Sequence, residues 1–132
     1  MQERMNNYAR AAIRAVELYK SHRMASPRQV WEEATAEIFG WGTPSQVKAC
    51  PRDAFLGLCE EGLIRSIPRG QYTKSSKNKR YALDAVTILK GDPRFVAYPS
   101  ALWKKVVKGA RKAHNQQMDV VIALRGEGLL AE

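Results

Sequence analysis

The sequence predicts an all-α protein of six main helices, built as two three-helix repeats that are related by a pseudo-twofold axis. The main observation is an internal duplication, because three segments of the first half return in the same order in the second half. Apolar residues at helical spacing within these segments are the second observation, and a glycine near the end of both third segments is the third. The paired positions are 15–20 with 85–90, Pro27 and Trp31 with Pro99 and Trp103, and 53–64 with 119–130.

These segments divide the 132 residues into one compact domain with three parts. We expect helical repeat one at residues 1–64, a basic inter-repeat linker at 65–80 and helical repeat two at 81–132. A chain of this length buries enough surface for one contiguous core. Its composition, 45% apolar and 27% charged, is that of an ordinary globular protein.

The first helix of each repeat is predicted from a stripe of apolar residues. The two stripes are Ala12, Ala15, Val16 and Tyr19 in repeat one, and Ala82, Ala85, Val86 and Leu89 in repeat two. Residues at this spacing lie on one face of a helix, so these side chains are expected to face the core.

The second helix of repeat one has a clear start signal. Ser26 is expected to cap it, with Pro27 at the first helical position and Gln29 completing a capping box. The inward stripes of the two second helices are Val30, Trp31, Ala34 and Ile38, and Leu102, Trp103, Val106 and Ala110. Both tryptophans are therefore predicted to be core residues.

The third helix of each repeat is expected to end at a glycine. Gly62 and Gly128 stand where a left-handed residue terminates a helix, with Leu63 and Leu129 folding back onto the helix end. Asp53 and Asp119 are interpreted as acids of the first turn that face the helix dipole, and not as catalytic residues.

Repeat one carries six more residues than repeat two between its second and third helices. The offset between paired positions falls from 72 (Pro27 to Pro99) to 66 (Asp53 to Asp119), which places the extra residues in 40–50. Such an insertion is a candidate binding element. The alternative interpretation is that Trp41 only covers an exposed edge of the core.

The net charge of +9 belongs entirely to the second half of the chain. Residues 1–64 carry 8 basic and 8 acidic side chains, whereas residues 65–132 carry 14 basic and 5 acidic ones. Two stretches, 65–80 and 94–118, hold six cations each and no carboxylate. With a pI near 9.8, this distribution predicts either a surface for an anionic partner or a solvated basic face that keeps the protein soluble.

A competing interpretation concerns the stretch 58–83. The residues LCEEGLIR at 58–65, followed by a polar basic stretch and RYAL at 80–83, resemble the part of winged-helix DNA-binding proteins where a recognition helix is followed by a β-wing. That resemblance implies strands at 64–67 and 81–83 with the wing tip at 70–79. The repeat is preferred, because residues 82–90 keep helical spacing.

Two segments carry a wider resemblance, WEEATAEIFG at 31–40 and CPRDAFLGLCEEGLI at 50–64. They are similar to members of a small bacterial family of α-helical proteins with no assigned function. The resemblance implies a helical fold and a bacterial or phage source, and it supplies no active site.

The sequence lacks the patterns of common catalytic and metal sites. Cys50, Cys59, His22 and His114 are scattered without metal-ligand spacing. No glycine-rich phosphate loop follows Gly40 and Gly42. A Cys50–His114 dyad stays open, although Cys50 is interpreted first as a small residue at a helix start. We therefore expect no enzyme activity, cofactor or small-molecule substrate.

Two cysteines and an N-terminus without an apolar segment predict a cytoplasmic protein. The longest apolar runs fall far short of the roughly 20 residues that a membrane-spanning helix needs, so no membrane partner is expected.

The leading function hypothesis is nucleic-acid binding by the second half of the chain. One group of cations is expected to form a helical ridge opposite Trp103, and the linker is expected to add more cations and a stacking tyrosine. The predicted binding residues are Arg69, Tyr72, Lys74, Lys77, Lys79, Arg80, Lys104, Lys108, Arg111 and Lys112.

The alternative hypothesis is a protein–protein interaction module or a homodimer. Its predicted contact residues are Trp41 in the inserted loop and the acids of the second helix, Glu32, Glu33 and Glu37.

Overall fold

The computed structural model describes residues 6–22 and 25–131, and within them the chain forms six α-helices and no β-strand. A short 3-10 helix, η1 (Pro93–Ala97), lies between the fourth and fifth of them. The α-helices are α1 (Asn7–Ser21), α2 (Pro27–Phe39), α3 (Ala49–Glu60), α4 (Ser76–Gly91), α5 (Pro99–Val106) and α6 (Gln117–Gly126). None of these helices combines the length and the apolar character needed to cross a membrane.

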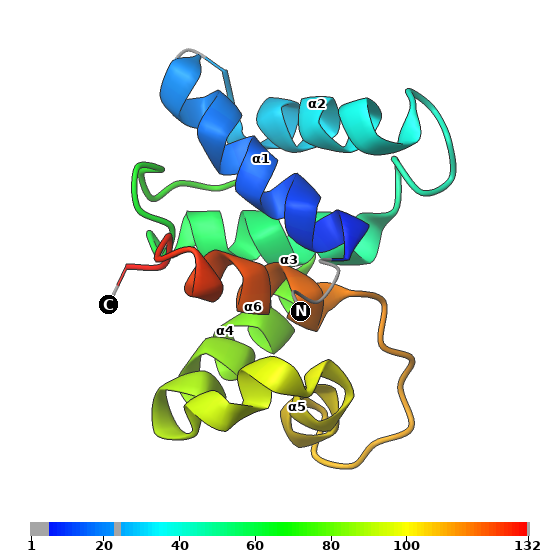
Figure 1. The fold of residues 1–132 in the computed structure, drawn as a ribbon, viewed down its shortest axis with the longest axis vertical. Coiled ribbons are helices and arrows are strands. Elements are labelled where there is room, and N and C mark those ends of the chain that lie inside the picture. Colours follow the sequence, from blue (N-terminus) through cyan, green and yellow to red (C-terminus); the bar gives the residue numbers. More distant parts are fainter. Residues whose placement is uncertain (1–5, 23–24, 132) are drawn as a thin grey trace, which may run out of the picture.

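The helices stack in three levels around one core (Figure 1). α1 and α2 pack on each other at the top, α3 and α6 lie side by side across the middle, and α4, η1 and α5 lie below. α3 packs mainly against α4, and α1 packs against α6, so the two middle helices join the upper and lower levels.

The predicted core stripes of the first helices are confirmed. All the alanines and valines of the two stripes are buried, as is Leu89, while Tyr19 is half-buried and packs against the core. Trp31 and Trp103 are both buried. The capping box is also confirmed: the Gln29 backbone N–H donates to Ser26 Oγ at 3.1 Å, and the Ser26 N–H donates to Gln29 Oε1 at 2.8 Å.

Two matching glycine caps end α3 and α6. Gly62 and Gly128 have φ angles of 70° and 69°, in the left-handed region that favours glycine. The Leu63 N–H donates to Leu58 O at 3.1 Å, and the Leu129 N–H donates to Leu124 O at 2.9 Å. These bonds satisfy carbonyls that each helix end would otherwise leave unpaired.

The chain segments that follow the two caps pair with each other. Ile64 and Leu130 form an isolated antiparallel bridge, in which the Arg65 N–H donates to Leu129 O and the Ala131 N–H donates to Leu63 O. The strand partner that a β-wing would require is absent from the described chain, because residues 81–83 lie within α4. The winged-helix interpretation is therefore wrong.

The helix predicted through Ala110 is shorter than expected. α5 ends at Val106, and the chain turns where Lys108 and Gly109 adopt φ angles of 54° and 78°. Ala110 is consequently exposed, and not part of a core stripe. The physical reason is local: the Gly109 N–H donates to Lys104 O at 2.9 Å, as the Leu63 N–H donates to Leu58 O, so Lys108 takes the left-handed position that Gly62 has after α3.

Asp53 and Asp119 occupy different positions from each other. Asp119 lies in the first turn of α6, as predicted. Asp53 does not lie in the first turn of α3, because that helix already begins at Ala49. Asp53 is buried instead, and its carboxylate binds neighbouring side chains.

Candidate nucleic-acid interface

Two of the predicted linker cations are neutralised by acids at the end of α3. Lys79 Nζ lies 2.8 Å from a carboxylate oxygen of both Glu60 and Glu61, and a guanidinium nitrogen of Arg69 lies 3.7 Å from Glu61. Lys79 belongs to α4, together with Lys77 and Arg80, because α4 begins at Ser76. Lys79 and Arg69 are therefore less available to an anionic partner than their charge alone suggests.

Glu60 fixes the linker to the end of α3. Its side chain is only 10% exposed and accepts the backbone N–H groups of Tyr72 and Thr73 at 2.7 and 2.8 Å. Burial by itself raises the pKa of Glu60, but the hydrogen bond from Lys79 and the two backbone donors outweigh it and hold that pKa below its ordinary value. The clamp sets the position of the residues that follow, including Lys74.

Tyr72 is held within the linker. Its hydroxyl donates to Pro68 O at 2.7 Å, and its ring packs so closely on Gly70 that a Cβ there would lie 2.6 Å from the ring. Burial raises the pKa of the tyrosine above its ordinary value. The half-buried ring is thus held in a fixed position as a wall of the linker, and its predicted role in stacking on a base stays a prediction.

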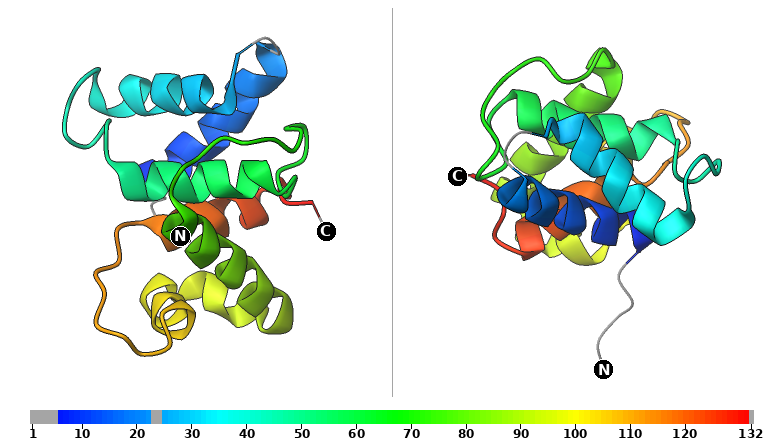
Figure 2. Two further views of the ribbon diagram at one scale, coloured as in Figure 1. Left: turned by 180° about the vertical axis from the view of Figure 1, so that it is seen from behind. Right: turned by 90° about the horizontal axis from the view of Figure 1, so that it is seen from above.

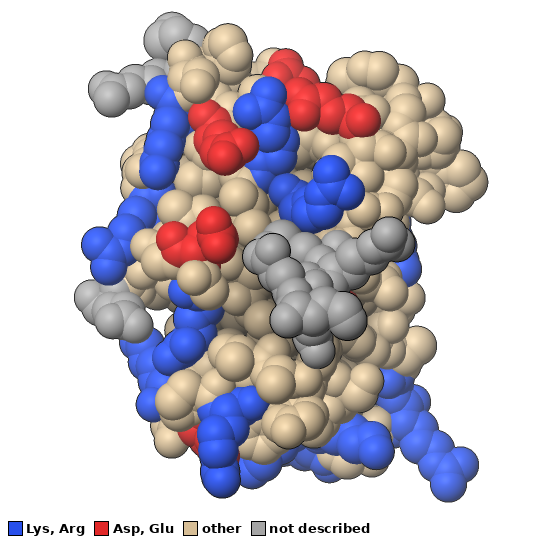
Figure 3. All heavy atoms as spheres, viewed as in Figure 1, with Lys and Arg blue, Asp and Glu red and all other residues tan. Residues whose placement is uncertain are grey.

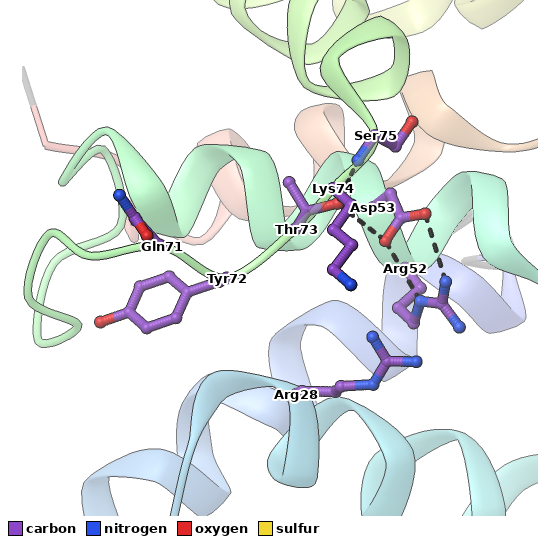
Figure 4. Close-up of a pocket in the computed structure, with 8 residues that line it drawn as sticks. All are labelled: Arg28, Arg52, Asp53, Gln71, Tyr72, Thr73, Lys74 and Ser75. Carbon is purple, nitrogen blue, oxygen red and sulfur yellow. Dashed lines mark hydrogen bonds and ion pairs between the residues drawn. The ribbon is translucent and has the colours of Figure 1, made fainter.

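A hollow of about 670 Å³ opens beside this linker, and we call it the linker hollow. Figure 4 shows its walls, which come from the start of α2, from α3 and from residues 71–75. It contains Tyr72 and Lys74 from the predicted set, together with two arginines that sequence reasoning missed, Arg28 and Arg52. Both arginines belong to the half of the chain whose net charge is zero, so no charge pattern pointed to them.

A second hollow, of about 470 Å³, lies at the end of α5, and we call it the C-terminal hollow. Lys104, Arg111 and Lys112 line it together, with Trp103 and His114. None of its lining residues carries a carboxylate. The convergence arises because the chain folds back after α5, where the Trp103 indole N–H donates to Lys112 O at 2.7 Å. The predicted cations thus meet across a turn, and the predicted continuous helical ridge is wrong.

The segment after α5 also lies against the start of α4. Lys112 Nζ is 3.1 Å from the Tyr81 hydroxyl and 5.7 Å from the centre of its ring. The Gln117 amide donates to Asn78 Oδ1 at 3.1 Å. The view from behind in Figure 2 shows this irregular segment returning from α5 to α6 along one side of the molecule. Tyr81, which follows Arg80 in α4 and lies about one turn after Lys77, therefore contacts residues that line the C-terminal hollow.

The cations of this region are not engaged by acids. Within residues 6–22 and 25–131, no carboxylate forms an ion pair with Lys104, Lys108, Arg111 or Lys112. Lys108 is exposed on the turn after α5 and does not line the hollow. On the face drawn in Figure 3, most acidic side chains lie over the upper part, near α1 and α2, and the lower part is mainly basic.

His114 closes the C-terminal hollow against α6. Its Nε2 accepts the Met118 N–H at 3.2 Å, and the same nitrogen lies 3.9 Å from Asp119 Oδ2. Burial lowers the pKa of His114 and raises the pKa of Asp119. Through the hydrogen bond from the Met118 N–H, His114 caps the first turn of α6.

Neither potential metal ligands nor the two cysteines form a cluster in the described part of the chain, and one of the cysteines is buried. No group of three or more His, Cys, Asp or Glu side chains there is arranged to hold a metal ion. Cys59 is buried, and burial raises the pKa of its thiol far above the ordinary value, which disfavours the reactive thiolate.

The inserted loop presents Trp41 to solvent. Trp41 is 69% exposed, so it does not cover an edge of the core, and Val47 in the same loop is 56% exposed. The loop is anchored by the buried Gln46, whose amide oxygen accepts the Gly42 N–H and whose nitrogen donates to Glu32 O.

The acids of α2 are partly balanced by neighbouring arginines. Glu37 pairs with Arg14 at 2.9 Å, and Glu32 pairs with Arg28 at 3.4 Å. Glu33 is exposed. The predicted acidic face of α2 is therefore weaker than its sequence suggests.

Fold and surface together define a small all-α protein with two basic hollows. The chain belongs to a family of unknown function, DUF6979, whose model matches residues 5–131. No curated protein and no solved structure matches the chain. The resemblance to a helical family without assigned function is thus confirmed, while the bacterial source that it implied stays a prediction.

Proposed function

We propose that the protein binds nucleic acid, without catalysis, through a basic surface at the C-terminal hollow and the adjoining start of α4. We call it the C-terminal basic surface; its residues are Lys77, Arg80, Lys104, Arg111 and Lys112. One observation carries the proposal: Lys104, Arg111 and Lys112 converge on a hollow whose lining contains no carboxylate. Cations without acidic partners are the groups that gain most from contact with phosphates, because binding releases condensed counterions.

The ion pairs show which of the predicted contact residues are most available to a phosphate. Lys79 and Arg69 are held by Glu60 and Glu61, so a phosphate would have to compete with these carboxylates. Lys104, Arg111 and Lys112 face no such competition within the described chain. Affinity should accordingly depend more on the C-terminal hollow than on Lys79 or Arg69.

Charge reversal at the hollow tests this proposal. We expect the unaltered protein to bind duplex or single-stranded nucleic acid with a dissociation constant of roughly 1–100 µM at moderate salt. The double variant Lys104→Glu/Lys112→Glu should weaken binding at least about tenfold and reduce the slope of log affinity against log salt by about 2, because two phosphate contacts are lost. Electrophoretic mobility shifts over a salt series measure both quantities.

The matched control places the same charge change on α1. Arg10 and Lys20 are exposed residues of that helix, so Arg10→Glu/Lys20→Glu lowers the net charge equally at a distant place. A loss of affinity that is equal in both double variants would show that only net charge matters, and would remove the C-terminal basic surface from consideration.

The second candidate function is protein binding or homodimerisation through the inserted loop, and the exposure of Trp41 favours it. Tryptophan is enriched among residues that dominate interface energies, and Gln46 anchors this one on an ordered loop. Size-exclusion light scattering should then detect a complex that tolerates salt and is lost in Trp41→Ala. A protein that stays monomeric and retains no partner from its host would contradict it.

We also propose that the six helices form two related three-helix repeats. The helix contacts support a twofold relation, because α1 packs on α6 as α4 packs on α3, and α3 and α6 contact each other. The matching caps at Gly62 and Gly128, and the bridge between Ile64 and Leu130, support it as well. Superposing α1–α3 on α4–α6 in a crystal structure should make Trp31 and Trp103 coincide.

A cytoplasmic location is proposed on the two free cysteines.

A further inference from the structure

We propose that the linker hollow binds a dianionic phosphate monoester. This inference is independent of the nucleic-acid proposal, because it concerns a different hollow and different residues. Three cations and one carboxylate line the space: Arg28, Arg52 and Lys74 against Asp53. Three positive charges and one negative charge leave an excess of two, and a phosphate monoester carries a charge of about −1.5 to −2 at neutral pH.

The three cationic groups point into the same space. Figure 4 shows the guanidinium groups of Arg28 and Arg52 and the ammonium group of Lys74 directed toward one another from α2, α3 and the linker. Like charges repel, so an arrangement that gathers three of them around an open hollow is stabilised by an anion placed between them. Arginine is the residue best suited to bind a phosphate through two parallel hydrogen bonds.

Asp53 holds Arg52 in place and does not neutralise the whole site. Its two carboxylate oxygens accept Nε–H and one Nη–H of Arg52 at 3.2 and 3.3 Å, and Oδ1 also accepts the Thr73 hydroxyl at 3.0 Å. Guanidinium has five N–H donors, so three of those on Arg52 remain for a ligand. The buried carboxylate therefore fixes the arginine in position, which lowers the entropic cost of binding.

The other two cations are also available. Arg28 contacts Glu32 only through Nε, at 3.4 Å and with both side chains about half-exposed, so its terminal nitrogens stay free. Lys74 is exposed and forms no ion pair with a carboxylate of the described chain. Its backbone position is set by the preceding residue, because Glu60 clamps the Thr73 N–H.

The linker hollow is larger than a bare phosphate ion requires. Its volume of about 670 Å³ extends from the cations to Gln71 and Tyr72, and Figure 4 shows the tyrosine ring away from the cationic groups. A phosphate between the arginines would thus leave space beside the ring for the organic group that it esterifies. A nucleoside fits this description, because a base can pack on an aromatic wall.

Two sources share this chemistry: a free mononucleotide and the 5′-phosphate end of a nucleic-acid strand. Calorimetric titration of the full chain with AMP, adenosine and inorganic phosphate tests the first. Titration with a short oligonucleotide carrying either a 5′-phosphate or a 5′-hydroxyl tests the second. If a mononucleotide is the ligand, AMP should bind at least roughly tenfold more tightly than adenosine, because a hydrogen-bonded charge is gained. If a strand end is the ligand, the oligonucleotide with a 5′-phosphate should bind more tightly than the one with a 5′-hydroxyl by the same factor. Equal binding of both members in both pairs would overturn the proposal.

Substitutions assign the binding to the linker hollow. Lys74→Gln and Arg28→Gln change exposed side chains and should each weaken binding of the preferred probe roughly tenfold. Arg52→Lys keeps the charge but loses the planar donor fork, and should weaken it as well. Arg10→Gln, on α1, is the matched control and should bind normally. Unchanged affinity in both Lys74→Gln and Arg28→Gln would place the phosphate elsewhere and refute the site.

The same experiment separates the two proposals. Lys104→Glu/Lys112→Glu should retain binding of the phosphate monoester even where it loses nucleic acid in mobility shifts. If that variant loses the monoester while Lys74→Gln keeps it, the linker hollow is excluded and the C-terminal hollow is the anion site.

Discussion

Replacing Trp31 by alanine should lower the free energy of unfolding by about 3–5 kcal/mol, a large part of the stability of a domain of this size. Trp31 is 1% exposed, and its ring stacks on Phe55 with centroids 5.2 Å apart. Truncation to alanine removes this packing and leaves a cavity that the rigid surroundings fill only in part. Urea unfolding followed by circular dichroism measures the loss.

A comparison of two phenylalanine variants isolates the indole N–H. Trp31 Nε1 is buried without a hydrogen-bond partner in the described chain, whereas Trp103 Nε1 donates to Lys112 O. Trp31→Phe deletes an unpaired donor, whose burial costs about 1–3 kcal/mol, so its effect should be small. Trp103→Phe deletes a satisfied donor and should destabilise the protein more. An equal or smaller loss in Trp103→Phe would contradict the assigned hydrogen bonds.

The second large effect is expected at Gly57, where α3 and α4 approach each other. A Cβ built on Gly57 would lie 2.7 Å from both Cα and Cβ of Lys79. Because backbone atoms cannot move aside as the tip of a side chain can, Gly57→Val should force the helices apart and destabilise the protein by about 3 kcal/mol. Gly57→Ala should show a smaller loss of the same sign. Urea unfolding again gives the magnitude.

Gly126 supplies the control for this prediction. It is also helical, but a Cβ there would meet nothing within 4 Å. Gly126→Ala should therefore stabilise the protein, by about 0.5 kcal/mol, since alanine loses less backbone entropy in a helix. If Gly57→Ala stabilised the protein as much as Gly126→Ala, the close approach of α3 and α4 would be refuted.

The close approach of α3 and α4 at Gly57 also helps to keep the linker hollow in shape. The close crossing lets Lys79 extend across α3 to Glu60, and Glu60 in turn clamps Tyr72 and Thr73. Separation of the helices should therefore loosen residues 71–75 and weaken any ligand held there. Nothing in the sequence around Gly57 indicates this role, because the contact joins residues that are 22 positions apart.

Where local rules were applied fully, the prediction from sequence was accurate. The capping box at Ser26 and the left-handed glycines at Gly62 and Gly128 depend on neighbours only a few positions away. The error at α5 arises because Lys108, and not a glycine, holds the left-handed position after the helix end. The same rule applied to Gly109 would end α5 one residue later than the structure does.

The candidate sites could be predicted only in part. Sequence composition located the excess of cations in the second half, and Lys104, Arg111 and Lys112 do converge there. It could not show that Lys79 and Arg69 are paired, or that Arg28 and Arg52 join Lys74. Their residue types and positions in the sequence do not distinguish the paired cations from the free ones.

The sequence alone therefore determined the helical class, the start of α2, the ends of α3 and α6 and most of the buried stripes, since these follow from hydrogen bonds and periodicity within a few turns of chain. Only the tertiary structure decided which charges meet. Ion pairing and anion binding depend on distances of a few ångströms between groups, and the three cations of the linker hollow come from separate elements, α2, α3 and the segment before α4. Packing of the helices sets those distances.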